Sequence, residues 1–304
     1  MGKIAFVFAG QGAQHIGMGR ALYDASPAVK DIFDEAEARR PGTLSLMFEG
    51  DEAELKKTEN TQPCLYLADL AAAAALREAG VSPDAVAGFS LGEIPALAFA
   101  GAYSAADGFA LAAVRGDAMG KAAAAVSASM AAIVKMTNEQ VEALCAQFDG
   151  VYPVNYNCPG QLVVSARTEV MKPFCDAVKA AGGRALPLNV SGGFHSPFME
   201  SAAAEFGAHL AGVEICTPAL PAYSNYTAAL YGDEVKSLLE MQIKSPVRWE
   251  TIIRRMADAG LDTFVECGPG STLAKLITKI LPDARTFSVE TPEQAAAAAK
   301  EILA

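Results

Sequence analysis

Short apolar runs alternate along this chain with longer segments of helical pattern. The runs Lys3–Ala9, Val86–Phe89 and Thr263–Cys267 have the length of strands, and each leads into a turn. The helical segments between them include Gln62–Ala79, Leu91–Ala100 and Ala105–Lys121. Strands that alternate with helices in this way predict an α/β fold with a mostly parallel sheet.

The middle of the chain has a different order of elements. Its strand-like segments are Met130–Met136, Gln161–Ala166 and Arg184–Val190. Helical patterns fill the two intervals, at Asn138–Phe148 and Glu169–Ala181. This order predicts a small α+β subdomain of ferredoxin-like type. We expect it to span residues 124–195, inserted in a larger α/β domain made of residues 1–123 and 196–304.

Composition narrows the class of protein. The chain has 304 residues, of which 52% are hydrophobic and 19% charged, which is typical of a globular protein with a large core. No uninterrupted apolar stretch reaches the roughly 18 residues of a membrane span. The N-terminal apolar run lacks the cleavage site of a signal peptide. We therefore expect a cytoplasmic protein that does not bind membranes.

Charge and cysteine usage exclude further classes. The net charge is −11, whereas a nucleic-acid-binding protein would carry a basic stripe. The six cysteines are scattered without a C-x-x-C pair, and only three histidines are present. We expect reduced thiols, no metal and no cofactor.

The segment Gly88–Gly92 reads Gly-Phe-Ser-Leu-Gly, which is the G-x-S-x-G pattern. It follows an apolar strand and opens a helical pattern, the context that a nucleophile elbow requires. Glycines allow the sharp turn that exposes the Ser90 hydroxyl at the end of the strand. Ser90 is therefore a candidate nucleophile.

A serine nucleophile needs a base, and histidine is the usual one. His209 falls in a helical segment and His15 in the loop after the first strand. His195 lies in a loop, Ser191–Pro197, at the end of the middle region. Because functional histidines favour such loops, His195 is the candidate base.

Arg115 interrupts the apolar stripe of its helix, where the neighbours three and four residues away are Leu111, Ala112, Ala118 and Met119. A guanidinium in such a place needs an anion to offset its desolvation. A structural pair with Asp or Glu and a clamp for a substrate carboxylate remain two open explanations. Gln11, after the first strand, is a candidate polar group at the carboxyl edge of the sheet.

Several segments together resemble the malonyl-CoA:acyl carrier protein transacylases and the acyltransferase domains of polyketide synthases. Phe6–Gln14 is similar to the opening F-x-F-x-G-Q-G-x-Q of that family, and Gly88–Glu93 to its G-H-S-L-G-E. The other matching segments, in the same order as in the family, are Thr61–Pro63, Arg115-Gly116, Asn155–Gln161, Phe194–Ser196, Ser245–Trp249 and Glu266–Gly270. The resemblance covers nearly the whole chain, and it implies an α/β-hydrolase-like large domain.

The resemblance also implies a role for each matching residue. Ser90 would be the nucleophile, His195 the base, and Arg115 the group that grips the malonyl carboxylate. Gln11 and the main-chain N–H of Leu91 would form the oxyanion hole. The main-chain carbonyl of Gln242 would orient the histidine, together with Asn225. Phe194 and Met119 would determine substrate specificity. Phe89 departs from the family, because a histidine usually precedes the nucleophile.

The implied reaction moves a malonyl group from malonyl-CoA to the phosphopantetheine thiol of acyl carrier protein, with coenzyme A released. It would proceed through malonyl-Ser90 and supply fatty acid biosynthesis, and we expect a monomer. One alternative is a discrete acyltransferase of a polyketide pathway. A second is a serine thioesterase or esterase, for which Asp176 falls in the interval where the third member of a triad is expected. A third is a carrier-docking protein without catalytic activity.

Overall fold

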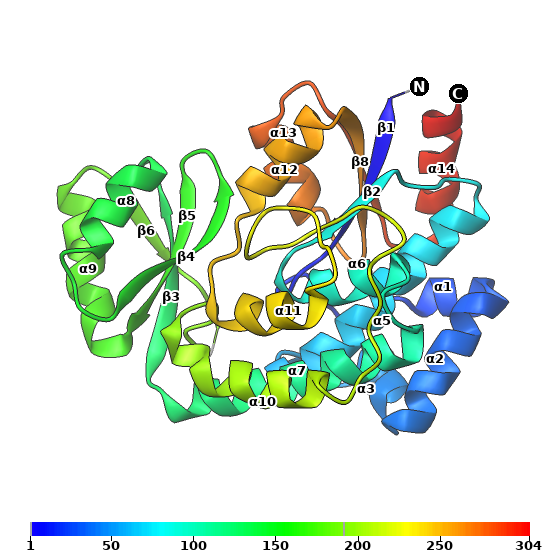
Figure 1. Ribbon diagram of the computed structural model, residues 1–304, viewed down its shortest axis with the longest axis horizontal. Coiled ribbons are helices and arrows are strands. Elements are labelled where there is room, and N and C mark those ends of the chain that lie inside the picture. Colours follow the sequence, from blue (N-terminus) through cyan, green and yellow to red (C-terminus); the bar gives the residue numbers. More distant parts are fainter. Residues whose placement is uncertain (1, 191) are drawn as a thin grey trace.

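A computed structural model describes residues 2–190 and 192–304 of the chain. Its larger sheet is parallel throughout, with the strand order β7-β2-β1-β8-β9, and Figure 1 labels β1, β2 and β8 of this sheet. The strands are β1 (Lys3–Phe8), β2 (Ala85–Gly88), β7 (Ala222–Tyr223), β8 (Leu261–Cys267) and β9 (Arg285–Val289). The predicted α/β class is therefore confirmed.

Side chains of β1 alternate between two hydrophobic cores, because successive residues of a strand point to opposite faces. Phe6 and Phe8 belong to the core that α5 (Thr58–Glu78) and α7 (Ala105–Ala125) also form. Ala5 and Val7 belong to the other core, with residues of α12 (Trp249–Asp258) and α13 (Thr272–Ile280). Burial on both faces explains why β1 reads as a continuous apolar run.

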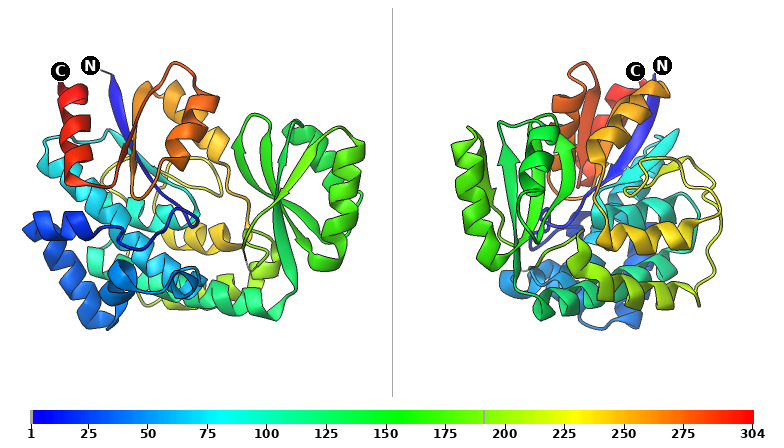
Figure 2. Two further views of the ribbon diagram at one scale, coloured as in Figure 1. Left: turned by 180° about the vertical axis from the view of Figure 1, so that it is seen from behind. Right: turned by 60° about the vertical axis from the view of Figure 1, so that its left-hand side comes forward.

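The second sheet is antiparallel, with the strand order β4-β5-β3-β6. Its elements follow the chain as β3 (Ala128–Val134), α8 (Asn138–Cys145), β4 (Val151–Cys158), β5 (Gln161–Arg167), α9 (Thr168–Ala180) and β6 (Arg184–Pro187). Figure 2 shows this green unit set beside the rest of the molecule. The order βαββαβ is that of a ferredoxin-like unit. All of these elements lie between residues 124 and 195, although the exact domain limits stay a prediction.

One strand of this unit, β4, was not predicted from the sequence. The sequence Asn-Cys-Pro-Gly-Gln at residues 157–161 is typical of a turn, but Asn157 and Cys158 end the strand and only Pro159 and Gly160 turn. Two irregularities in the pairing of β4 with β5 break the period of two on which strand prediction depends. Pro153 is tolerated because β4 is an edge strand.

The other helices complete the layers around the two sheets. They are α1 (Arg20–Ala25), α2 (Pro27–Arg39), α3 (Thr43–Glu49), α4 (Glu52–Leu55), α6 (Glu93–Phe99), α10 (Glu200–Leu210), α11 (Val235–Lys244) and α14 (Pro292–Leu303), with short 3-10 turns at Ser90–Gly92 and Pro197–Met199. Within the described ranges, no helix combines the length and the apolar character needed to cross a membrane.

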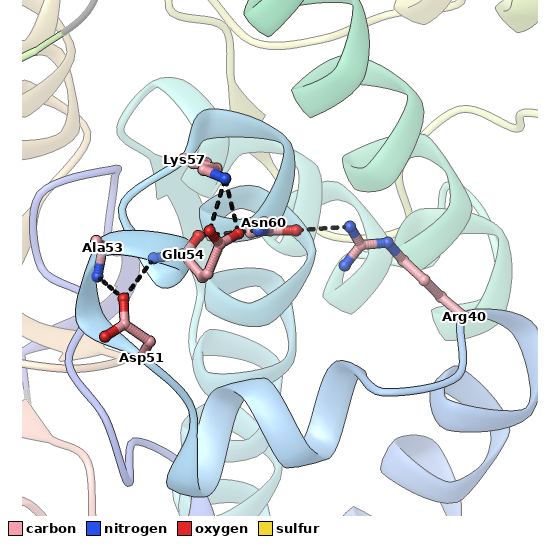
Figure 3. A network of polar contacts seen from close by, with 6 residues as sticks. All are labelled: Arg40, Asp51, Ala53, Glu54, Lys57 and Asn60. Carbon is pink, nitrogen blue, oxygen red and sulfur yellow. Dashed lines mark hydrogen bonds and ion pairs between the residues drawn. The ribbon is translucent and has the colours of Figure 1, made fainter.

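Helix α5 begins one turn before the predicted Gln62, and polar contacts fix this first turn. Asn60 accepts a hydrogen bond of 2.8 Å from Arg40, and Lys57 pairs with Glu54 (Figure 3). Pro63 has no N–H to donate to the carbonyl of Glu59, and Arg40 donates to that carbonyl instead. The start of α5 is therefore held firmly.

Candidate active site

The G-x-S-x-G segment forms a tight turn between β2 and α6. Ser90 adopts a left-handed conformation, with φ of 55°. A Cβ atom on Gly88 would lie 1.9 Å from the main-chain carbon of Gly92, and one on Gly92 would lie 2.2 Å from the carbonyl oxygen of Phe8. Neither position can hold a side chain, so both glycines are required for the strained turn that presents Ser90.

Ser90 faces His195 directly. The distance from Ser90 Oγ to His195 Nε2 is 2.6 Å, and His195 Nδ1 lies 3.0 Å from the main-chain oxygen of Gln242. Because a carbonyl can only accept, the Nδ1 atom carries the proton and Nε2 presents its lone pair to the Ser90 hydroxyl. Gln242 therefore takes the place of the carboxylate found in other serine enzymes.

Burial and, to a smaller extent, the positive charge of Arg115 lower the pKa of His195 to about 4. The imidazole is only 3% exposed. At neutral pH it is uncharged, and it is therefore free to accept the proton of Ser90.

Arg115 projects from α7 toward the same hydroxyl. Its Nη1 donates to Gln62 Oε1 at 2.8 Å, while Nη2 donates to Gln242 Oε1 at 2.8 Å and to Ser90 Oγ at 3.3 Å. Over residues 2–190 and 192–304, no carboxylate lies within ion-pair distance of it. Burial lowers the pKa of Arg115 to about 10, so it stays charged at neutral pH. Of the two explanations left open by the sequence, a direct structural pair is not present.

The expected oxyanion groups flank the nucleophile. Leu91 follows Ser90 in the 3-10 turn. Gln11, after β1, lines the same pocket as Ser90 and His195, and its Nε2 donates to Thr58 Oγ1 at 3.2 Å. The fixed start of α5 thus orients the amide of Gln11.

A pocket of about 100 Å³ opens beside Ser90. Phe194 and Met119 line its apolar side, and they are 7% and 2% exposed. The sulfur of Met119 lies 3.5 Å from Gln62 Nε2, which links the pocket wall to the Arg115 contacts. The two expected specificity residues therefore border the space next to the nucleophile.

A second cavity, of about 210 Å³, shares four lining residues with the first, namely Gln11, Phe89, Asn155 and Leu188. Asn157 also lines it. The side-chain oxygens of Asn155 and Asn157 are buried and have no hydrogen-bond donor within the described chain. This cavity can thus receive N–H donors of a ligand that reaches Ser90.

Asn225 lies at the nucleophile elbow and not against the histidine. Its Oδ1 accepts from the Ser90 N–H at 2.7 Å, and its Nδ2 donates to the Gly88 carbonyl at 2.6 Å. The expectation that Asn225 orients His195 was therefore wrong, since the Asn225 hydrogen bonds of the described structure go to other groups and the main-chain oxygen of Gln242 contacts His195 Nδ1. The reason is that Asn225 follows β7, which pairs with β2 at the edge where the elbow begins.

Three polar residues of the site were not singled out from the sequence: Gln62, Glu93 and Tyr231. Gln62 and Glu93 stand in segments that match family motifs, which was the available signal. Tyr231 lies outside the matching segments, and its hydrogen-bond partner Glu93 is 138 positions away, so nothing in the local sequence pointed to it.

The alternative acid and base residues lie elsewhere. His15 is exposed and contacts Glu290, and His209 is exposed on α10. Asp176 is exposed on α9 and pairs with Lys172 at 2.8 Å, so it does not support the triad of a hydrolase. The rings of Phe89 and Trp249 pack in a T-shaped arrangement, with centroids 5.5 Å apart.

Within residues 2–190 and 192–304, no group of three or more His, Cys, Asp or Glu side chains could hold a metal ion. The polar groups that converge on Ser90 are an imidazole, a guanidinium and three amides. This arrangement can activate a hydroxyl and hold an anion beside it.

Comparison with known proteins gives a consistent family. The acyl transferase domain family matches residues 5–296. The malonyl CoA-acyl carrier protein transacylase of Bacillus subtilis is 40% identical over 301 residues, which are 96% of this chain and 95% of that protein. The solved malonyl CoA-acyl carrier protein transacylase of Clostridium perfringens superposes with a TM-score of 0.95 at 34% identity, covering 99% of this chain and 97% of that one.

A second solved structure holds a malonyl-transacylase in complex with its type II polyketide synthase acyl-carrier protein. It matches with a TM-score of 0.93 at 33% identity, over 98% of this chain and 99% of that chain. The match spans both sheets, the elbow and the histidine loop. This chain belongs to the acyl transferase family, in its malonyl-CoA:acyl carrier protein transacylase branch.

Proposed function

We propose that this protein transfers a malonyl group from malonyl-CoA to the phosphopantetheine thiol of acyl carrier protein, supplying extender units for fatty acid biosynthesis. The observation that carries the proposal is a buried, charged Arg115 that has no carboxylate partner among the described residues and lies 3.3 Å from the hydroxyl of a Ser90–His195 pair. An acyl group that ends in a carboxylate would supply the missing anion. Simple esters have no use for this charge.

The first half-reaction forms the acyl-enzyme. His195 Nε2 removes the proton of Ser90 as Oγ attacks the thioester carbonyl. The tetrahedral oxyanion would be held by Gln11 and the Leu91 N–H. The C–S bond then breaks, the proton passes from His195 to the sulfur, and coenzyme A leaves with its thiol restored.

The second half-reaction reverses these roles. The carrier thiol enters, His195 takes its proton, and the thiolate attacks the ester carbonyl of malonyl-Ser90. The bond to Oγ breaks, Ser90 regains its proton, and malonyl-carrier protein leaves. Because both thioesters present the same pantetheine arm, one binding route serves both. The second cavity, with its free Asn155 and Asn157 oxygens, suits the amide N–H groups of that arm.

Phe194 and Met119 would set specificity by limiting the space beside Ser90, where a branched methylmalonyl group needs extra room. We further propose a cytoplasmic monomer whose inserted domain spans residues 124–195. A discrete acyltransferase of a polyketide pathway remains the second candidate. It is favoured by the solved relative that is bound to a polyketide synthase acyl-carrier protein.

The transfer itself can be tested with purified components. The protein is mixed with malonyl-CoA and phosphopantetheinylated acyl carrier protein, and the carrier and the small molecules are followed by mass spectrometry. The proposal predicts malonyl-carrier protein and an equal amount of free coenzyme A. Free malonate without malonyl-carrier protein would instead identify a thioesterase.

A further inference from the structure

A buried carboxylate, Glu93, lies behind the site and takes no part in the reaction described above. It is 1% exposed and receives three hydrogen bonds. Their donors are the Asn225 N–H at 3.0 Å, Gln242 Nε2 at 2.7 Å and the hydroxyl of Tyr231. We propose that Glu93 is a positioning residue, an inference that rests on the proposed function. Glu93 fixes the positions of Ser90, His195 and Arg115 relative to one another and so sets the selectivity for malonyl-CoA.

The first branch runs through Gln242. A carboxylate can only accept hydrogen bonds and a guanidinium can only donate them. The amide of Gln242 lies between the two, so its NH₂ must face Glu93 and its oxygen must face Arg115, as the 2.7 and 2.8 Å contacts show. The same NH₂ donates to the Ser90 carbonyl at 2.7 Å.

Gln242 also contacts the catalytic base, His195. The main-chain carbonyl of Gln242 accepts from His195 Nδ1 at 3.0 Å. A Gln242 residue that shifted within the site would move the imidazole and the guanidinium at once. Glu93 thus acts on both groups through one neighbour, without touching either.

The second branch runs through Asn225. Its N–H donates to Glu93, while its side chain bonds the Ser90 N–H and the Gly88 carbonyl. These two groups lie at the middle and at the start of the strained elbow, Gly88–Gly92. Glu93 therefore also supports the left-handed conformation of Ser90.

The separation of charges explains why the carboxylate does not block the substrate. Glu93 and Arg115 do not pair directly, because the Gln242 amide stands between them. Burial raises the pKa of Glu93 to about 7, even though the hydrogen bonds from Tyr231, Asn225 and Gln242 and the charge of Arg115 act in the opposite direction. At pH values above this pKa the guanidinium has a nearby counter-charge in Glu93, while its Nη2 atom faces Ser90 Oγ at 3.3 Å, on the side where the malonyl group would be attached.

The test compares wild type with Glu93→Gln, Glu93→Asp and the control Glu37→Gln. Glu37 is also a carboxylate that receives N–H donors, from Gly42 and Leu44, but it lies on α2. For each protein, kcat/KM is measured with malonyl-CoA and with acetyl-CoA, and Tm is recorded. The amide introduced by Glu93→Gln cannot accept from all three donors, so the Gln242 NH₂ group loses one of its two acceptors and is held less firmly.

We expect the malonyl-to-acetyl ratio of kcat/KM to fall about tenfold or more in Glu93→Gln, since Arg115 is no longer held for the carboxylate. Glu37→Gln should keep the wild-type ratio. A merely structural role would lower both activities in parallel with Tm and leave the ratio unchanged. Glu93→Asp keeps an acceptor-only carboxylate but shortens its reach, and it should also lower the ratio.

Ratios within twofold of wild type in the folded Glu93 variants would overturn the positioning role while leaving the proposed function intact. If Glu93→Gln does not fold, the ratio of Glu93→Asp decides. Absence of any malonylation of the wild type would overturn both proposals.

Discussion

Replacing Arg115 with methionine removes the charge that is proposed to select malonyl-CoA, while keeping a side chain of similar length. The guanidinium is 1% exposed and holds the side-chain oxygens of Gln62 and Gln242. The substitution leaves these two oxygens without a donor, which costs about 1–3 kcal/mol of stability each. The variant should therefore be less stable than wild type, and its folding must be checked before its kinetics.

The kinetic effect follows from the loss of one partner of a buried ion pair, which typically costs about 3–5 kcal/mol. Because the guanidinium already donates hydrogen bonds to Gln62 and Gln242, the lower end of this energy range applies. About 3 kcal/mol corresponds to a roughly 150-fold fall in kcat/KM for malonyl-CoA. Acetyl-CoA lacks the carboxylate, and its kcat/KM should change by no more than about threefold.

Coenzyme A release can be followed for both thioesters under the same conditions. Arg115→Lys serves as the matched control, because it keeps the charge but loses the planar fork, and it should give an intermediate ratio. An equal fall for malonyl-CoA and acetyl-CoA would refute the reasoning, since it would mean that Arg115 supports the fold of the site and not the recognition of a carboxylate.

Three further predictions concern the elbow, the base and the acyl pocket. Gly88→Ala should destabilise the fold by about 3 kcal/mol or more in urea unfolding, because there is no room for its Cβ atom. The control Gly212→Ala should unfold like wild type, because its Cβ atom would make only an ordinary contact at 3.7 Å. The pKa of His195 is about 4 in the folded protein, whereas its ordinary value is 6.5. Between pH 6.5 and pH 4 the unfolded state therefore binds more protons than the folded state, and stability decreases as the pH falls. Protonation of His195 in the unfolded state should lower the free energy of unfolding by about 2 kcal/mol between pH 7.5 and pH 5. If the free energy of unfolding of His195→Gln depended on pH as steeply as that of wild type, this prediction would be contradicted. Phe194→Val should raise acylation by methylmalonyl-CoA about tenfold or more relative to malonyl-CoA, and an unaltered preference would mean that Phe194 does not limit the pocket.

The parts of this fold that were predictable from sequence depend on local pattern. β1 and the elbow were predicted because a strand buried on both faces reads as an apolar run, and because the turn requires glycine at fixed positions. Arg115 stood out because a charge in an apolar helical stripe is rare. In each case the signal lies within a few residues of the feature.

The parts that were not predictable depend on contacts between distant segments. Asn225 reaches Ser90 across 135 positions, and Gln242 reaches Glu93 across 149. Neither contact leaves a periodic signal in either segment. β4 was missed for a local reason, since its irregular pairing and its polar residues erase the alternation of a regular strand. Family motifs pointed to the region of the active site but assigned Asn225 to the wrong partner.

The most direct test of the central claim is the intact mass of the protein after mixing with malonyl-CoA, in wild type and in Ser90→Ala. We predict that the wild type gains one malonyl group, located by peptide mapping on Ser90, with one equivalent of coenzyme A released, and that Ser90→Ala gains none. A wild type that releases no coenzyme A and carries no adduct, or a Ser90→Ala protein that is still malonylated, would contradict the assignment of Ser90 as the nucleophile of a malonyl transfer.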